Sequence, residues 1–142
     1  MLLSKRSTYA VRVLVDMAEH NGLNEYIPTK QLANRQEISN KYLESIMSLL
    51  SKAHLIDALG GKGGGYKLNR PLKKYRLLDI LEVTEDSLSP VDCLKEGAKP
   101  CPRSHNCRTL QTWKKLYTLI TDFFKDITIE DLVGQDIDDY II

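Results

Sequence analysis

The chain has 142 residues, 42% of them hydrophobic, which predicts one domain, or one domain with an appended helix, around a real apolar core. No stretch approaches the roughly 18 apolar residues that a membrane span needs, and residues 1–6 lack the apolar segment of a signal peptide. We therefore expect a cytoplasmic protein that does not associate with membranes.

The net charge of +1 hides an asymmetry between the two halves of the chain. Residues 1–76 carry thirteen Lys or Arg against six Asp or Glu, a net charge of +7, whereas residues 77–142 carry seven against thirteen, a net charge of −6. A basic half followed by an acidic half is typical of a compact nucleic-acid binder. A DNA-reading element is therefore expected in the first half.

Three helices are predicted in the basic half. The first covers residues 7–19. Its expected apolar stripe consists of Ala10, Val11, Leu14, Val15 and Ala18. A short second helix covers residues 29–36, and after a tight turn a longer third helix begins at Ser39.

The third helix has two distinct faces. Apolar residues at i, i+3, i+4 and i+7 should be buried, and these are Leu43, Ile46, Met47 and Leu50. The opposite face is polar and consists of Lys41, Glu44, Ser45, Ser48 and Lys52. Such a face fits a DNA major groove, where base edges can be read. On an isolated helix it would more often be only a solvated surface.

A glycine-rich hairpin is predicted over residues 57–68, directly after the third helix. Five of the six residues 60–65 are glycine, which weakens strand interiors and suits a sharply turning tip that lies close to a phosphate backbone. Lys62 supplies a positive charge at this tip. Two helices followed at once by such a hairpin favour DNA reading over the solvated-surface alternative, and they predict a mainly α winged helix-turn-helix fold with a small β-hairpin wing.

The acidic half begins with a helix near residues 77–84, which should bury Leu77, Ile80 and Leu81, and continues with an irregular loop over residues 86–106. A long helix follows over residues 109–126. Thr128 then caps a short turn over residues 129–133, which Gly134 closes.

The long helix carries two apolar lines. A heptad seam consists of Leu110, Trp113, Tyr117, Ile120, Phe124 and Ile127. A second line consists of Leu116, Leu119 and Phe123. A single helix buried in its own core is the alternative, but so short a chain has little else to cover both lines, which favours a helix-mediated homodimer.

Three cysteines, Cys93, Cys101 and Cys107, lie in or at the edge of the loop before this helix with the spacing C-x7-C-x5-C. Their number is odd and their neighbours are charged residues and prolines, which argues against disulfides or simple core packing. Soft thiolates so close together indicate an iron–sulfur cluster, or zinc with His105 as a fourth ligand. Thiol chemistry without a metal is the third alternative.

No enzymatic motif is present. His20, His54 and His105 have no motif partner, and the chain has no nucleophile elbow, phosphate loop or HExxH pattern. We predict that the protein is not an enzyme and has no catalytic residues.

The sequence resembles a family of winged-helix repressors. The stretches that carry the resemblance are Leu3-Ser4-Lys5 with Tyr9-Ala10, Ile38-Ser39 with Lys41-Tyr42-Leu43-Glu44, Gly63-Gly64-Gly65-Tyr66, Pro90-Val91-Asp92-Cys93, Cys101-Pro102-Arg103 and Cys107-Arg108. The family includes the iron–sulfur regulator IscR, the nitric-oxide sensor NsrR, the iron regulator RirA and the cluster-free cysteine-metabolism regulator CymR. The resemblance extends from the N-terminus to about Leu132.

The resemblance implies roles for individual residues. Cys93, Cys101 and Cys107 would ligate a [2Fe-2S] or [4Fe-4S] cluster. Glu44 would read bases in the major groove, and Lys62 with its neighbouring glycines would place the wing in the minor groove. The full set of expected DNA-binding residues is Ser4, Lys5, Tyr9, Thr29, Ser39, Lys41, Tyr42, Glu44, Ser45, Ser48, Lys62, Gly63 and Gly64.

The chain also departs from the family. Leu110 stands where the iron–sulfur regulator has its histidine ligand, and Thr8 stands where the nitric-oxide sensor has an aspartate ligand. Gly60 stands where members commonly carry an arginine. The remaining candidates for a fourth ligand are an exchangeable small molecule or one of Asp92, Glu96, His105 and a partner-chain carboxylate such as Asp16 or Glu19.

These observations predict a homodimeric transcriptional repressor that binds a pseudo-palindromic operator in double-stranded DNA. The expected regions are a DNA-binding domain over 1–85, a cluster loop over 86–108, and a dimerisation helix with an acidic tail over 109–142. The repressor would sense iron–sulfur, redox or nitric-oxide status through the cluster. The alternative is a cluster-free repressor controlled by thiol chemistry or by a protein partner.

Overall fold

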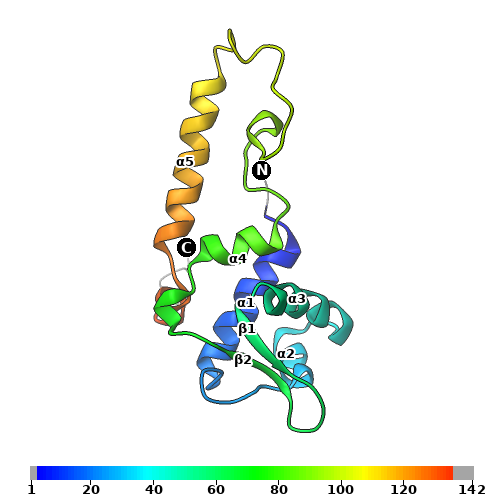
Figure 1. The fold of residues 1–142 in the computed structure, drawn as a ribbon. Helices are drawn as coiled ribbons and strands as arrows, with labels where there is room; N and C mark the ends of the chain where they lie inside the picture. Colours follow the sequence, from blue (N-terminus) through cyan, green and yellow to red (C-terminus); the bar gives the residue numbers. More distant parts are fainter. Residues whose placement is uncertain (1–2, 136–142) are drawn as a thin grey trace.

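A computed structural model describes residues 3–135, and it is mainly helical with one two-stranded hairpin (Figure 1). The elements in chain order are α1 (Lys5–Glu19), α2 (Thr29–Gln36), α3 (Asn40–Lys52), β1 (Ile56–Leu59), β2 (Gly65–Leu68), η1 (Leu72–Lys74), α4 (Leu77–Thr84), η2 (Asp92–Leu94), α5 (Leu110–Asp126) and α6 (Ile129–Val133). The last residues of the predicted acidic tail, 136–142, lie outside the described part. None of the helices in residues 3–135 is long and apolar enough to span a membrane.

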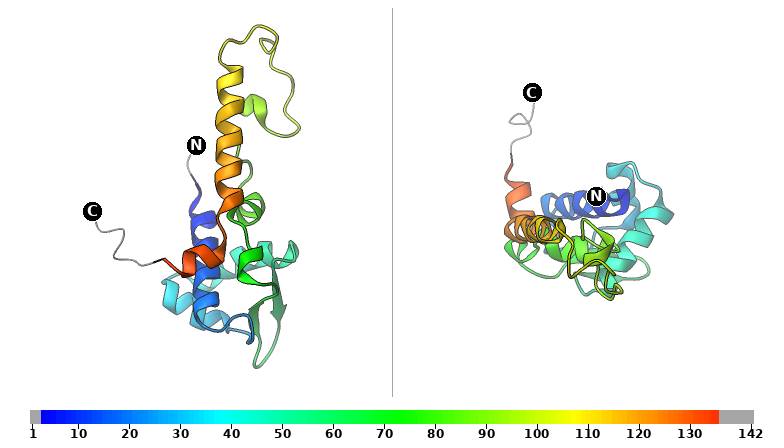
Figure 2. Two further views of the ribbon diagram at one scale, coloured as in Figure 1. Left: turned by 90° about the vertical axis from the view of Figure 1, so that its left-hand side faces the viewer. Right: turned by 90° about the horizontal axis from the view of Figure 1, so that it is seen from above.

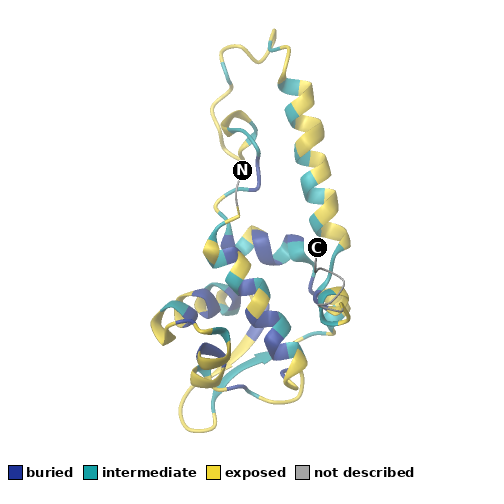
Figure 3. Ribbon diagram, turned by 180° about the vertical axis from the view of Figure 1, so that it is seen from behind, coloured by how far each residue is buried: buried dark blue, intermediate teal, exposed yellow. Residues whose placement is uncertain are grey.

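The core lies where α1, α3, α4 and the base of the hairpin meet, as the dark residues in Figure 3 show. The predicted inner face of α3 is confirmed, since all four of its apolar residues are fully buried. On α4, Ile80 and Leu81 are buried as predicted, but the third buried apolar residue is Leu78, and Leu77 is only half-buried.

The predicted stripe on α1 is partly wrong. Its buried apolar residues are Ala10, Val13, Leu14 and Met17, whereas Val11, Val15 and Ala18 are half-buried. The reason is that α1 crosses the centre of the body and contacts α2, α3, α4, α6 and β2. Its buried face is therefore wider than a single stripe, and it includes the polar residues Ser7 and Asp16.

The hairpin is the predicted wing. Its strands pair antiparallel from Ile56 opposite Leu68 to Leu59 opposite Gly65. The segment before α2 adds a third short edge, because the backbones of Ile27 and Tyr66 exchange hydrogen bonds of 2.8 and 2.9 Å. The wing is therefore held against the start of α2 as well as the end of α3.

The base of the wing is fixed by Tyr75, which is fully buried. Its hydroxyl donates to the Leu55 carbonyl at 2.6 Å and accepts from the Asn69 N–H at 3.0 Å. Burial raises the pKa of Tyr75, so the hydroxyl keeps its proton and remains a donor. One side chain thus joins both ends of the hairpin to the body.

Helix α5 projects from the body in the direction opposite to the wing (Figures 1 and 2). None of its residues is buried; the predicted heptad seam is half-buried, and Leu116, Leu119 and Phe123 are 38%, 67% and 60% exposed. The C-terminal end of α5 is held by a hydrogen bond of 2.8 Å from the Leu77 N–H to the Ile127 carbonyl. The predicted cap at Thr128 is confirmed, and it forms a capping box with Asp131.

Substituting Gly65 by alanine should destabilise the fold by about 2–3 kcal/mol. Gly65 has φ 141°, and an added Cβ would collide with the Ile27 carbonyl, so the wing edge would have to open. Urea unfolding followed by circular dichroism would measure the change. Gly60→Ala is the matched control, because an added Cβ there meets no atom within 4 Å; equal stabilities of the two variants would contradict this account of the wing.

Candidate nucleic-acid interface and cysteine loop

The polar face of α3 is open to solvent. All five residues predicted for it are exposed, namely Lys41, Glu44, Ser45, Ser48 and Lys52. Ser39 caps the helix, because its side chain accepts a hydrogen bond of 3.2 Å from the Tyr42 N–H. The arrangement leaves a straight polar ridge with its apolar side anchored in the core.

The start of α3 packs on α1 through aromatic rings. Tyr9 and Tyr42 meet edge to face with ring centroids 5.8 Å apart. The Arg12 guanidinium lies over the Tyr9 ring at 4.8 Å from its centroid. The sequence predicts both tyrosines as DNA-binding residues but not Arg12, which is exposed in the same cluster.

The wing contacts α3 through β1, and Tyr66 lies on the paired strand β2. Burial raises the pKa of Tyr66, a hydrogen bond with Thr29 opposes this rise, and the negative charge of Glu44 adds to it. The predicted site residues Thr29 and Glu44 therefore lie near one hydroxyl of the wing strand. A hollow between α2 and the hairpin is lined by Pro28, Thr29, Ala58, Leu59, Gly60, Gly61, Gly64, Gly65 and Tyr66, and Lys62 is exposed at the tip.

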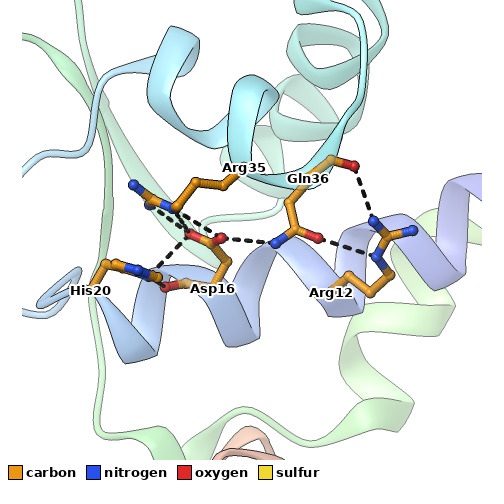
Figure 4. A network of polar contacts seen from close by, with 5 residues as sticks. All are labelled: Arg12, Asp16, His20, Arg35 and Gln36. Atoms are coloured by element: carbon orange, nitrogen blue, oxygen red, sulfur yellow. Dashed lines mark hydrogen bonds and ion pairs between the residues drawn. The ribbon is translucent and has the colours of Figure 1, made fainter.

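A buried carboxylate fixes α2 on α1 (Figure 4). Asp16 is 5% exposed, and Arg35 donates to both of its oxygens, with the shortest bond at 2.6 Å. Gln36 donates to Asp16 at 2.8 Å and accepts from Arg12 at 3.1 Å. Burial alone would raise the pKa of Asp16, but the hydrogen bonds and the positive charge of Arg35 hold it below its usual value.

This network was not predicted from the sequence, and it changes the list of candidate cluster ligands. Asp16 is buried and paired within its own chain, so it is not available as a ligand from a partner chain. Asp92 forms an ion pair of 2.9 Å with Lys95, and this contact lowers the pKa of Asp92. Glu19 is exposed on α1.

The three cysteines are free thiols in the segment between α4 and α5. Cys93 lies in η2 and is exposed, and Cys101 and Cys107 are half-exposed. The pKa of Cys107 is lowered, chiefly by hydrogen bonding with the Thr109 hydroxyl at 3.4 Å. Within residues 3–135, no three His, Cys, Asp or Glu side chains come together as a set that could hold a metal ion.

The fold and its exposed polar helix define a winged helix-turn-helix protein of the DNA-binding class. Residues 3–135 match a family model described as "Iron-dependent Transcriptional regulator", Rrf2. The chain belongs to the Rrf2 family of transcriptional regulators. This confirms the family resemblance seen in the sequence and the prediction that the protein is not an enzyme.

The relatives include the "HTH-type transcriptional regulator IscR" of Sodalis glossinidius, 31% identical over 136 residues that cover 96% of this chain and 81% of the relative. The same regulator of Vibrio campbellii is 32% identical over 133 residues, covering 94% and 77%. The fold is similar to that of CymR, the global cysteine regulator of B. subtilis, with a TM-score of 0.74, 26% identity, and coverage of 96% and 99%. For T. potens IscR the TM-score is also 0.74 with 26% identity, and coverage is 100% and 93%.

Replacing Asp16 by asparagine should lower the free energy of unfolding by about 2–4 kcal/mol at about pH 7. The pKa of Asp16 is lowered in the fold, so its contribution is fully present above the usual carboxyl value and is lost as the pH falls through the lowered pKa. The difference from wild type should therefore shrink towards about pH 3.

Urea unfolding at several pH values would measure this difference. Glu19→Gln, an exposed carboxylate on the same helix, is the matched control and should change stability by less than about 0.5 kcal/mol. A difference for Asp16→Asn that stays constant over the whole pH range would show that the charge of Asp16 is not what stabilises the α1–α2 contact.

Proposed function

We propose that this regulator is a dimeric repressor that places α3 in the major groove of a pseudo-palindromic operator and the wing in the adjacent minor groove. The observation that carries the proposal is the exposed polar face of α3, which lies beside the glycine wing through contact with β1 and is backed by a fully buried apolar face. Two such helices in a dimer would read half-sites about one helical turn apart.

In this arrangement Glu44 reads base edges, since a carboxylate accepts hydrogen bonds from cytosine amino groups in the major groove. Lys41, Ser45 and Ser48 extend the same ridge. Lys62, Gly63 and Gly64 bring the wing tip close to the sugar–phosphate backbone, while Thr29 faces the hollow between α2 and the wing. These contacts combine base reading with sequence-independent attraction.

Phosphate contacts are assigned to the helix starts. Ser4 and Ser39 are N-caps of α1 and α3, so their hydroxyls already accept hydrogen bonds from the chain. The positive ends of these helices attract phosphate, with Lys5, Tyr9 and Tyr42 as the neighbouring side chains. The caps therefore support phosphate binding by fixing where each helix begins.

The dimer is proposed to form through α5. The exposed line of Leu116, Leu119 and Phe123 and the half-buried heptad seam lie on α5, whose main contact with the body is with α4. Large apolar side chains exposed in a row are typical of a protein–protein contact. A second copy of α5 would cover them, so residues 109–142 form the proposed dimerisation region beside a DNA-binding domain over 1–85.

The loop over 86–108 is proposed to hold a [2Fe-2S] or [4Fe-4S] cluster through Cys93, Cys101 and Cys107. Three free thiols in one loop, none packed in the apolar core, have the donor chemistry that such clusters require. The cluster would supply sensitivity to iron, redox state or nitric oxide. The loop is connected at one end to α4 and at the other to α5. Ordering or release of the loop would therefore shift the two α3 helices of the dimer relative to each other.

Glu44→Ala and Lys62→Ala should affect DNA binding in different ways. Glu44→Ala should relax base preference at one position of each half-site, at a cost of about 1–3 kcal/mol. Lys62→Ala should weaken binding to all sequences about equally and flatten the salt dependence. Selection from a randomised duplex library, followed by salt titration, separates the two effects. An unchanged selected sequence for Glu44→Ala would refute the docking of α3.

Protein purified without oxygen should contain iron and acid-labile sulfide in near-equal amounts and absorb visible light. Cys101→Ala should lose both, whereas Ser104→Ala, in the same loop, should retain them. Elemental analysis with a visible spectrum provides the measurement. A colourless, iron-free protein that still binds DNA would instead support a repressor controlled by zinc, by thiol chemistry or by a partner, and the cluster proposal would fail.

A further inference from the structure

The start of α1 and the end of α4 are joined by a polar contact that the proposed function does not use. The Ser4 N–H donates to the Glu85 carboxylate at 2.7 Å, and the Arg6 guanidinium donates to the Thr84 carbonyl at 2.7 Å. The Ser7 and Thr84 hydroxyls share a buried hydrogen bond of 2.7 Å. We name these five residues the helix-end clamp.

The clamp caps two helices reciprocally. An N-terminus leaves N–H groups free and attracts negative charge, and a C-terminus leaves carbonyls free and attracts positive charge. Glu85, just past the end of α4, supplies the carboxylate for α1, and Arg6, in the first turn of α1, supplies the cation for α4. Burial alone would raise the pKa of Glu85, but hydrogen bonds from Ser7 and Ser4 lower it, which keeps the carboxylate charged.

The clamp lies between the two proposed functional regions. On one side are Ser4 and Lys5, which are assigned to phosphate contact. On the other side the chain continues from Glu85 directly into the cysteine loop. Figure 1 shows that the end of α4 lies at the start of α1. Arg6 also approaches Asp86, the first residue of the loop, at 3.7 Å.

We propose that Glu85 is a positioning residue for DNA binding, and that the helix-end clamp is the link through which the cysteine loop and bound DNA affect each other. The proposal rests on the proposed docking of α1 on phosphates. Glu85 does not touch DNA; it fixes the first turn of α1, whose N–H groups and Lys5 do. Because coupling between two sites is reciprocal, DNA bound at α1 must alter the loop if the loop alters DNA binding.

The test uses the full-length chain, metal-free and reduced, with a short mixed-sequence DNA duplex at low salt, since phosphate contacts do not depend on sequence. Glu85→Ala should bind the duplex about fivefold or more weakly than Glu82→Ala. Both substitutions remove one negative charge, Glu82 from α4 and Glu85 from its C-terminal cap. Glu82 is the control because it is exposed and does not belong to the clamp. Glu85→Gln should recover most of the affinity, because its amide oxygen can still accept from the Ser4 N–H.

A second readout follows the loop itself. The rate at which a maleimide labels Cys93, read by mass spectrometry, should change about twofold or more when the duplex binds wild type or Glu82→Ala. The duplex should not change this rate in Glu85→Ala. Should circular dichroism find Glu85→Ala unfolded, Arg6→Gln carries the same labelling test, because it removes the bond to Thr84.

The proposal would be overturned by a labelling response in Glu85→Ala equal to that of wild type, or by a duplex affinity of Glu85→Ala equal to that of Glu82→Ala. A wild-type rate that the bound duplex leaves unchanged would likewise show that the loop and α1 are not linked. Failure of wild type to bind any duplex at low salt would refute the proposed function itself, so the two failures are distinguishable.

Discussion

The contact of Asp16 with Arg35 is the constraint on which the DNA-reading part of the molecule depends. It fixes α2 on α1 by an ion pair in which the Asp16 carboxylate is almost fully buried and the Arg35 side chain stays 29% exposed. Removing Arg35 would leave the buried Asp16 carboxylate without its cation, which is costly, so this contact favours the observed packing of α2 on α1. Gln36 extends the network to Arg12, which stacks on Tyr9, and Tyr9 packs on Tyr42 of α3. Helix α3 is thus oriented by polar groups as well as by its buried apolar face.

Burial differs sharply between the body of the protein and the segment after α4. The body has one large apolar cluster and a smaller one formed by Leu78, Leu81 and Leu88, whereas none of residues 90–109 is buried and α5 has no buried residue. A segment without a core gains little from hydrophobic burial to offset the entropy of ordering it. Residues 90–126 therefore lack the burial that fixes the body, and the proposed cluster loop and dimerisation helix both lie in this segment.

Much of the fold was predictable because short-range signals agree with one another. The two faces of α3, the glycine hairpin and the cap at Thr128 each follow from residues close together in the chain, and all three are confirmed. The stripe on α1 was only partly predicted, because burial there depends on how many elements cross the helix. The pairing of Asp16 with Arg35 could not be found in the same way, since nothing local connects residues nineteen positions apart.

The candidate site likewise has features that follow from neighbouring residues and others that depend on distant contacts. The exposed ridge of α3 was predictable from helical periodicity, while the approach of Tyr66 to Thr29 and Glu44 depends on how the wing folds back on α2. The cysteine spacing indicated the donor chemistry, but spacing in an irregular loop does not determine which atoms meet. The helix-end clamp combines both cases: a serine before a helix is a readable cap, yet its second partner, Glu85, lies eighty-one residues away. Because Glu85, which caps α1, directly precedes the loop, the coupling proposed above needs only a small displacement of the loop's first residues to alter the first turn of α1.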